Sequence, residues 1–369
     1  MSSDKKTICL VVPSLVSGGM ERVMSEIAND FSTREDIDAH LIILTKQPLF
    51  YKLNENVKVH EPEFETKGVN KLSTTFRVLF FLRNKLKELK PHSFLSFGGK
   101  YNSFVMLSTL GLKMKKYISD RNSPKINSRL TFKNNSVYKT GSGFQYIMKH
   151  LLYPSATGII VQTETAKNIE EDRLRHPNII KIPNPVRTIG FEGVPKEKII
   201  LNVGRFVATK QQEFLIEIFA KTNNEGWKLL FAGEGPLLKH AQELVKDLKL
   251  ENKVEFAGTT TKVDELYQKS EIFAFTSVSE GFPNALAEAL NTPLATIAID
   301  CVAGPADLIE DGYNGFLVKE KEVETYTSKL QQLMDDENLR ETFKRHCLIK
   351  MNNFRYDIVM NEFHKILTK

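Results

Sequence analysis

The chain has 369 residues, of which 41% are hydrophobic and 26% are charged, and its formal net charge is +6 at pH 7. This balance is typical of a soluble globular protein long enough for two domains of ordinary size. It excludes a disulfide-framed or membrane-spanning class, because the chain has only three scattered cysteines and no apolar run of about 18 residues. The short apolar run at 8–12 predicts a first strand and not a signal peptide, so we expect a reducing cytosol.

Charge is distributed unevenly along the chain. Residues 1–185 contain 28 Lys and Arg against 17 Asp and Glu, or +11, whereas the remainder contains 23 against 28, or −5. A basic N-terminal half indicates an anionic partner, such as a membrane surface, a lipid-linked phosphate or a nucleic acid. The alternative is that these lysines only solvate a surface.

The N-terminal half opens with a predicted strand at 7–12, a glycine-containing loop, a helix at 20–31 and a strand at 39–45. Residues 71–90 predict an amphipathic helix with aromatic and basic residues, which either covers a sheet or lies on an anionic bilayer. The segment 113–149 is basic and is predicted to be loop-like. Its cations include Lys115, Lys116, Arg121, Lys125, Arg129, Lys133 and Lys139.

The C-terminal half repeats the pattern, with a strand at 198–203, a loop, and a helix that contains Phe214, Leu215, Ile218 and Phe219. Further short apolar strands at 228–233, 253–258 and 272–277 alternate with helical stretches such as 237–249. Alternation of this kind favours parallel sheets covered on both faces. The sequence therefore predicts an α/β fold of two Rossmann-like domains, which face each other across a cleft and join near 182–190.

Two loops have the chemistry to hold a diphosphate at the carboxyl ends of their strands, where doubly wound folds bind ligands. Gly18 and Gly19 follow the first strand, where glycine lets the backbone approach a ligand and the helix start favours negative charge. The loop from Gly204 to Lys210 follows a strand of the second half. It places Arg205 and Lys210 on one rim, which suits two adjacent phosphates.

A third loop, TSVSEGFPNALAEAL at 276–290, carries two glutamates eight residues apart. Proline is favoured at a first helical position, so a helix is predicted to begin at Pro283 or Asn284. Glu280 then lies in the preceding loop, while Glu288 faces inward from the second turn. The amides near Asn284, Ala285 and Leu286 would point toward an anion at the loop mouth. The two acids are thus predicted to have separate jobs.

Together these residues resemble the retaining glycosyltransferase family 4 (group 1), whose members have the GT-B fold. The resemblance spans nearly the whole chain, and its signature is a pair of glutamates separated by seven residues, here Glu280 and Glu288. Other matching motifs are SGGMERV (17–23), SDRN (119–122), IVQTE (160–164), IPNPV (182–186), VGRFVATK (203–210), AGEGP (232–236) and GPADLIEDGYNGFLV (304–318).

The resemblance implies a role for each matching position. Arg205 and Lys210 would bind the donor diphosphate and offset the charge that develops on the leaving group. Glu280 would hold the transferred sugar, and Glu288 the ribose. The other donor-binding positions it implies are Gly18, Gly19, Gly204, the base-flanking Gly258 and Thr259, and Gly281, Phe282, Pro283, Asn284 and Ala285.

The polar catalytic helper is the least defined of the implied roles. Asp120 or Arg121 occupies the cleft-edge position where many relatives carry a histidine, so the candidate catalytic residues are Glu280, Arg205, Lys210, Asp120 and Arg121. Retention in this family is described as front-face attack, with the donor phosphate helping to take the acceptor proton. Glu280 is therefore not assigned as a covalent nucleophile, and the paired-carboxylate logic of glycosidases is not applied.

The resemblance implies an N-terminal acceptor-side domain at 1–185 and a C-terminal nucleotide-sugar domain at 186–353, with a last helix in 354–369 packing back on the first. The expected enzyme moves a hexose or N-acetylhexosamine from a nucleoside diphosphate sugar, UDP-linked, to a glycan acceptor. That acceptor is expected to be lipid-linked, in bacterial surface polysaccharide or glycan assembly. We expect a cytoplasmic protein, peripheral at the inner face of the membrane and in contact with anionic lipid.

No metal is expected, because the eight histidines are dispersed without ligand spacing. The leading function also implies no cofactor and no nucleic acid partner. The DxD at Asp36 to Asp38 precedes a strand, so it is predicted to be a solvated turn. Two other functions stay open at this point. One is a nucleotide-sugar epimerase or hydrolase on the same scaffold, which would consume donor without an acceptor. The other is a non-catalytic binder of anionic lipid or nucleic acid, which depends on the basic half alone.

Overall fold

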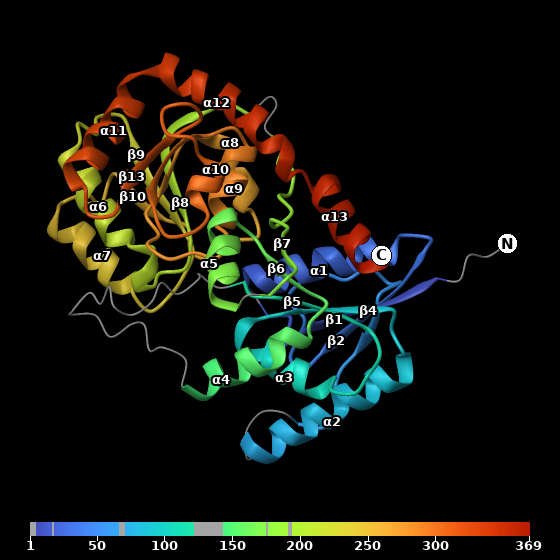
Figure 1. Cartoon of the computed structure of the whole chain (residues 1–369). Coiled ribbons are helices and arrows are strands. Elements are labelled where there is room, and N and C mark those ends of the chain that lie inside the picture. The colour runs from blue at the N-terminus through green and yellow to red at the C-terminus, as the bar shows by residue number, and fades with distance from the viewer. Residues whose placement is uncertain (1–4, 17, 66–70, 122–142, 175, 191–193) are drawn as a thin grey trace. The chain divides into compact units, whose positions relative to one another are not determined.

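The computed structural model of the chain describes residues 5–16, 18–65, 71–121, 143–174, 176–190 and 194–369. Its contacts divide the chain into two units, which are described separately (Figure 1). Unit 1 consists of Met1–Asn184 together with Asp357–Lys369, and unit 2 is Pro185–Tyr356. The division into an acceptor-side domain at 1–185 and a nucleotide-sugar domain at 186–353 stays a prediction.

Unit 1 is built on a parallel sheet that, among the described residues, has seven strands in the order β3-β2-β1-β4-β5-β6-β7. Parallel strands need crossover connections, and here helices supply them. The strands are β1 (Lys6–Val12), β2 (Ile37–Ile43), β3 (Lys58–His60), β4 (Ser93–Phe97), β5 (Lys115–Ser119), β6 (Gly158–Val161) and β7 (Ile179–Lys181).

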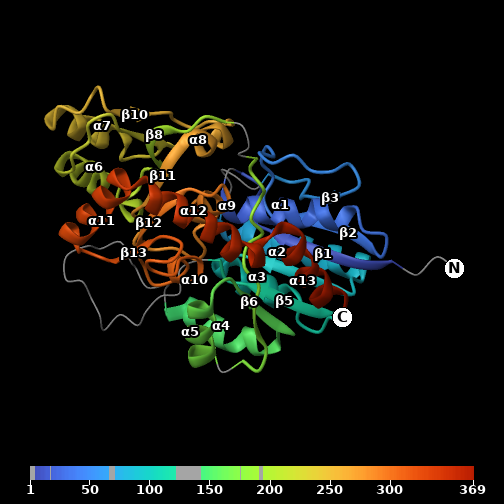
Figure 2. The same ribbon diagram turned by 90° about the horizontal axis from the view of Figure 1, so that it is seen from above.

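Helices cover both faces of this sheet. They are α1 (Gly19–Ser32), α2 (Lys71–Leu89), α3 (Gly99–Ser108), α4 (Gly143–Leu152), α5 (Glu164–Leu174) and α13 (Tyr356–Thr368), with a short 3₁₀ turn, η1 (Tyr153–Ser155). Val78, Leu82 and Leu86 of α2 share one core with Val105 of α3 and Tyr153 of η1. Figure 1 shows α1 and α13 on the other side of the strands, the side that Figure 2 views from above.

The last helix of the chain, α13, completes unit 1. Its buried residues Val359, Met360 and Phe363 recur at helical spacing, which gives the helix one apolar side. The hydroxyl of Ser93 in β4 donates a hydrogen bond of 2.7 Å to the Leu367 carbonyl. The last helix is therefore bound to a strand that lies 274 residues earlier in the chain.

Unit 2 is built on a second parallel sheet, with six strands among the described residues in the order β10-β9-β8-β11-β12-β13. Side chains along a strand point to alternate faces. Ile200 of β8 accordingly belongs to one core cluster, and its neighbour Leu201 belongs to another. The strands are β8 (Glu197–Val203), β9 (Lys228–Ala232), β10 (Val254–Phe256), β11 (Ser270–Phe275), β12 (Ala295–Asp300) and β13 (Phe316–Lys319).

The helices of unit 2 divide between these two clusters. Helices α6, α7 and α11 contribute to the first and lie together in Figure 1, whereas α8, α9 and α10 contribute to the second. The elements are η2 (Ala208–Lys210), α6 (Gln212–Lys221), α7 (Leu238–Asp247), α8 (Val263–Lys269), α9 (Asn284–Asn291), α10 (Pro305–Leu308), α11 (Val323–Asp335), α12 (Glu337–Met351) and η3 (Asn352–Phe354). The prediction of two Rossmann-like parallel sheets is confirmed.

Two local predictions were wrong. The segment 113–149 is not loop-like throughout, because it contains β5 and most of α4. The lysines at the start of β5 obscured the strand, although its last three residues, Tyr117 to Ser119, are buried. Lys125, Arg129, Lys133 and Lys139 lie outside the described residues.

The DxD is the second correction, because it is not a fully solvated turn. Asp38 lies inside β2 and forms an ion pair of 2.7 Å with Lys58 of β3. Asp36 accepts a hydrogen bond of 2.8 Å from the His364 ring. Both carboxylates therefore bind neighbouring elements of unit 1.

Candidate functional site

The loop after β8 lies against the loop after β9 with backbone touching backbone. The amide of Phe206 donates to the Glu234 carbonyl at 2.9 Å, and the amide of Gly204 donates to the Ala232 carbonyl at 2.9 Å. A Cβ on Gly235, whose φ is +158°, would lie 2.4 Å from the Phe206 carbonyl oxygen. This close approach needs glycine, and it holds the predicted phosphate loop in place.

Lys210 and Glu280 meet at the carboxyl end of this sheet. The Lys210 ammonium donates a short hydrogen bond to the Glu280 carboxylate, and their side chains are 26% and 12% exposed. The Thr276 hydroxyl donates to the Lys210 carbonyl at 2.8 Å, which joins η2 to the chain leaving β11. The structure thus brings together two residues that the sequence predicted for one site from 70 positions apart.

Arg205 lies on the same loop with a different environment. Its side chain is exposed, and among the described residues it forms no ion pair with a carboxylate. Its carbonyl accepts a hydrogen bond of 3.1 Å from the side-chain amide of Gln212. The backbone is therefore held while the guanidinium remains accessible to a ligand.

Helix α9 begins where the sequence predicted. Asn284 is its first residue, Pro283 precedes it as the N-cap, and no side chain caps this end by a hydrogen bond. A Cβ on Gly304 would lie 2.3 Å from Cδ of Pro283, so the loop before α10 closely packs against the helix start. The Asn284 amide already donates to the Phe282 carbonyl at 3.0 Å, so it is not the free amide that the sequence predicted. The anion site at this helix start stays a prediction.

Glu288 faces inward from α9, as predicted, and is 5% exposed. Its Oε1 lies 3.2 Å from Nε of Arg187, whose Nη1 forms an ion pair of 2.7 Å with Asp264. Glu280 and Glu288 therefore have different cationic partners, and the separate jobs expected for them stay a prediction. The sequence analysis missed Arg187, because it lies 101 residues from Glu288 and its only signal was the motif that joins the two halves.

The remaining positions predicted in unit 2 lie in adjoining loops. Gly258 follows β10 with φ +64°, and its carbonyl accepts a hydrogen bond of 2.8 Å from the Gly233 amide. Thr259 is exposed, whereas Phe282 is 6% exposed and packs with the core. Gly281 lies between Glu280 and Phe282 in the same loop.

In unit 1, Gly18 and Gly19 form the start of α1, and Ser17 lies outside the described residues. The Tyr51 hydroxyl accepts from the Gly18 amide at 3.0 Å and donates to its carbonyl at 2.8 Å. The Glu21 carboxylate folds back so closely that a Cβ on Gly18 would lie 2.2 Å from its Oε2. Burial raises the pKa of Glu21, and a backbone hydrogen bond lowers it by a smaller amount.

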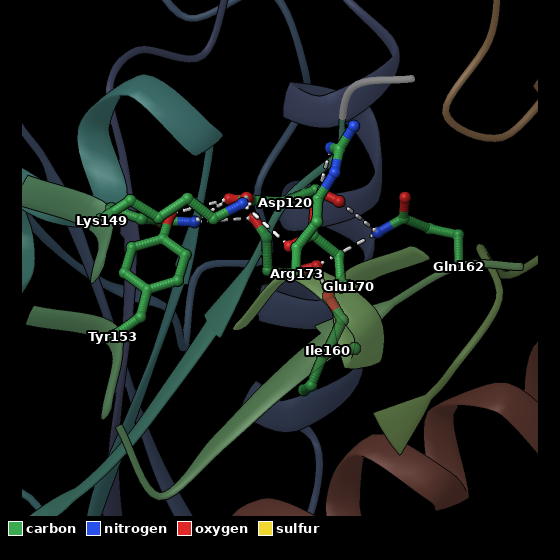
Figure 3. A network of polar contacts seen from close by, with 9 residues as sticks. Asp120, Lys149, Tyr153, Ile160, Gln162, Glu170 and Arg173 are labelled. Carbon is green, nitrogen blue, oxygen red and sulfur yellow. Dashed lines mark hydrogen bonds and ion pairs between the residues drawn. The ribbon is translucent and has the colours of Figure 1, made fainter. Parts of the chain in front are cut away.

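Asp120 lies in a buried polar network at the end of β5 (Figure 3). The Lys149 ammonium bridges Asp120 Oδ2 at 2.7 Å and Glu170 Oε2 at 3.0 Å. Asn102 and Tyr153 donate to Asp120 Oδ1 at 2.9 and 3.0 Å. Both carboxylate oxygens of Asp120 are therefore occupied by residues of unit 1.

The electrostatics of this network keep Asp120 charged. Burial alone would raise the pKa of Asp120, but the Lys149 ammonium and the hydrogen bonds hold it below its ordinary value. Burial and the charge of Asp120 raise the pKa of the Tyr153 hydroxyl well above its usual range. An ionised, fully paired carboxylate is a weak proton acceptor, so the arrangement favours a scaffold role for Asp120.

Arg121 points away from this network. Its Nη1 donates to Asn184 Oδ1 at 2.7 Å, and its guanidinium stacks 3.8 Å from the centroid of the Phe97 ring. Nε and Nη2 are buried and have no hydrogen-bond partner among the described residues. Burial lowers the pKa of this guanidinium to about 9.

The part of the chain that the structure describes contains neither a candidate metal site nor a candidate membrane-spanning helix. Within it, His, Cys, Asp and Glu side chains do not gather in threes that could hold a metal ion. No described helix combines the length and the apolar run needed to cross a bilayer.

Sequence comparisons relate this chain to glycosyltransferases. Residues 190–346, all in unit 2, match the family model "Glycosyl transferases group 1". A Campylobacter jejuni protein, GalNAc-alpha-(1->4)-GalNAc-alpha-(1->3)-diNAcBac-PP-undecaprenol alpha-1,4-N-acetyl-D-galactosaminyltransferase, is 26% identical over 98% of both chains. The amylovoran biosynthesis glycosyltransferase AmsD of Erwinia amylovora is 26% identical over 95% of this chain and 96% of its own.

Solved structures show the same fold. A mutant of S. aureus TarM, crystallised with fondaparinux, alpha-GlcNAc-glycerol and UDP, superposes with a TM-score of 0.80 at 16% identity, over 99% of this chain and 100% of its own. At that identity the likeness concerns the fold alone. The chain therefore has the GT-B fold of two parallel-sheet units, and its residues 190–346 match the group 1 glycosyltransferases.

Proposed function

We propose that this protein is a retaining glycosyltransferase that takes a hexosyl or N-acetylhexosaminyl group from a UDP-linked donor. The observation that carries the proposal is the meeting of Lys210 with Glu280, next to exposed Arg205, at the carboxyl end of a parallel sheet. Two cations suit a diphosphate, and a carboxylate suits sugar hydroxyls. The crystallised TarM complex, which contains UDP, supports the choice of nucleotide.

In the proposed reaction, Arg205 and Lys210 offset the negative charge that develops on the leaving diphosphate, so the chemistry is metal-independent. Glu280 exchanges its contact with Lys210 for hydroxyls of the sugar. Glu288, oriented by Arg187, accepts hydrogen bonds from the ribose. The acceptor oxygen attacks from the face that the diphosphate leaves, and a donor phosphate oxygen takes the acceptor proton, so the anomeric configuration is retained.

The polar helper on unit 1 is proposed to be Arg121 and not Asp120. Asp120 is already bound by Lys149 and two neutral donors, whereas Arg121 keeps two buried nitrogens without a partner among the described residues. A buried guanidinium is stabilised most by a ligand whose oxygen atoms accept its hydrogen bonds. The start of α1 at Gly18 and Gly19 is proposed as the donor contact of unit 1.

The acceptor is proposed to be a lipid-linked glycan in the assembly of a bacterial surface polysaccharide. The C. jejuni relative is named for a diphospho-undecaprenol acceptor and the E. amylovora relative for amylovoran biosynthesis. The net positive charge of residues 1–185 supports the proposal that this half of the chain binds an anionic partner. We propose that the protein works at the inner face of the membrane, peripherally bound.

Calorimetric titration with UDP tests the donor site. Lys210→Ala and Arg205→Ala should each raise the Kd for UDP by about tenfold or more, because each removes a charge-assisted contact to phosphate. Lys228→Ala is the matched control: Lys228 is 52% exposed, pairs with Glu255 and should leave the Kd unchanged. Equal affinities in all four proteins would contradict the proposed site.

A further inference from the structure

The outer side of one helix layer in unit 1 is apolar. Helices α2, α3 and α4 lie side by side on one face of the sheet (Figure 1). Much of the large hydrophobic surface that the described residues expose gathers here. We call this surface the outer apolar face, and it consists of Leu72, Phe76 and Phe80 in α2, Leu107 in α3, Leu110 just after α3, and Ile147 and Leu151 in α4.

Helix α2 carries two apolar stripes where a sheet-covering helix needs one. Val78 and Leu82 are buried in the core, together with Leu86 one turn further on. Phe76 and Phe80, spaced four residues apart, lie on a different side and are 55% and 57% exposed. Covering the sheet accounts for the first stripe only. The second stripe stays more than half exposed in the part of the chain that the structure describes.

The same surface continues across α3 and α4. Arg83 ties α2 to the end of α3, because its Nη1 donates hydrogen bonds of 2.8 Å to the carbonyls of Ser108 and Leu110. Phe80 lies one turn before Arg83 on α2. Leu151 of α4 is 69% exposed, the largest exposed fraction among these residues. Three helices thus present one apolar surface.

Positive charge accompanies this surface, and negative charge is nearly absent. Arg77 and Lys87 of α2 are exposed, whereas the single acid of α2, Glu88, is bound by Lys85 at 2.8 Å. The sequences of α3 and α4 contain no Asp or Glu. Aromatic and aliphatic side chains interspersed with Arg and Lys are typical of helices that lie in the interface of an anionic membrane.

We propose that the outer apolar face docks on an anionic phospholipid bilayer, with Phe76 and Phe80 inserted at the headgroup boundary. The proposal deepens the proposed function and rests on it, because a lipid-linked acceptor lies in such a bilayer. A second copy of the chain is a poorer occupant: a symmetric contact would bring Arg77 and Lys87 toward their own copies without acids to pair with. A bilayer with anionic headgroups satisfies both the apolar and the basic residues.

Sedimentation with vesicles of phosphatidylcholine and phosphatidylglycerol in a 3:1 ratio tests the docking face. The double variant F76S/F80S should partition onto these vesicles about tenfold or more weakly than the unchanged protein, because two exposed rings lose their burial. L348S/I349S, which changes two exposed apolar residues of α12 in unit 2, is the matched control and should partition normally. Binding should weaken as salt rises and on pure phosphatidylcholine.

The outcomes separate this inference from the donor site. F76S/F80S should keep the circular dichroism spectrum and the UDP affinity of the unchanged protein, since both rings are exposed. Equal partitioning of F76S/F80S and the unchanged protein would overturn the docking face. Light scattering that shows a dimer for the unchanged protein and a monomer for F76S/F80S would also overturn it. If the unchanged protein partitions onto the vesicles as expected but does not bind UDP, the proposed function is contradicted and the docking face is not.

Discussion

At the scale of single residues, Lys149 is a charge held by two carboxylates at once. It joins Asp120 and Glu170 inside unit 1, where the three side chains are 22%, 16% and 7% exposed. Removing one member of a buried ionic group leaves the others charged and unpaired, which costs more than the pair itself contributes. The network is therefore a point where a single substitution has a large effect on stability.

Lys149→Met should lower the free energy of unfolding by about 3 kcal/mol at pH 7, because Asp120 loses its cation and Glu170 keeps only a longer contact of 3.9 Å with Arg173. The Lys149 charge lowers the pKa of folded Asp120, so the stability it supplies is present above the unfolded pKa and is lost as pH falls through the folded pKa. The difference between variant and unchanged protein should thus shrink toward pH 3. Urea denaturation at both pH values measures it, and an equal difference at the two would contradict this account.

Lys228→Met is the matched control for that experiment. Lys228 also pairs with a carboxylate, Glu255 at 2.6 Å, but both side chains are about half exposed. A surface pair of this kind contributes little, so its loss should leave the free energy of unfolding nearly unchanged.

Sequence reasoning worked well for residues marked by local signals. Gly281 and Pro283 indicated a turn and a helix start, and these separated Glu280 from Glu288. Arg187 and Lys149 could not be found in this way, because each takes its importance from partners that are distant in the sequence. The sequence shows that Asp120 or Arg121 stands where many relatives carry a histidine. The partner of Asp120, Lys149, lies on a helix 29 residues later, and no local pattern connects the two.

At the scale of elements, the start of α9 depends on a glycine in a neighbouring loop. Gly304 has φ +107°, and a Cβ there would lie 2.3 Å from Cδ of Pro283. Gly312 also has positive φ, +77°, but a Cβ there would meet no heavy atom within 4 Å. A side chain would be strained by the positive φ at both positions but crowded only at Gly304, so comparing alanine variants isolates the contact with the helix start.

Gly304→Ala should destabilise the protein by about 2–4 kcal/mol, the sum of positive-φ strain and a clash with proline. Gly312→Ala should cost only about 1 kcal/mol, since strain acts alone. Gly304→Ala should also weaken UDP binding by displacing Pro283, whereas Gly312→Ala should not. Thermal unfolding and calorimetry measure both effects, and equal losses in the two variants would remove the proposed link to α9.

Elements with a clear apolar pattern were predicted within a few residues, including β1, β8, β9 and α7. β5 was missed, because its first two residues are lysines and only the order of strands in the sheet buries the rest. Propensity and periodicity carry no information about which strand lies next to which. The order of the strands came only from the structure.

At the scale of the whole molecule, unit 1 needs the last residues of the chain. Phe363 of α13 is fully buried, and the Ser93 hydroxyl binds the Leu367 carbonyl. Phe363→Ala should lower the free energy of unfolding by about 3–5 kcal/mol through the lost burial and the cavity left behind. Lys365→Ala, an exposed change on the same helix, should be nearly neutral. Chemical denaturation compares the two, and similar stabilities would mean that α13 is dispensable to unit 1.

The architecture was predictable because strand and helix patterns alternate in both halves, and parallel sheets follow from near-continuous apolar strands. The donor and acceptor were not predictable from the same reasoning. A few side chains choose between similar sugars, with energy differences far smaller than those that determine a fold.

The contact between Lys210 and Glu280 has a consequence for selectivity. Each of these two charges neutralises the other in the structure. A lone phosphate that bound the Lys210 ammonium would leave the Glu280 carboxylate without its partner. A free monosaccharide that bound the carboxylate would leave the ammonium without its partner. Only a molecule that carries an anion and neighbouring hydroxyls together replaces both halves of the pair at once. In the proposed donor site, the contact between the two side chains thus favours the intact donor over a lone phosphate or a free sugar.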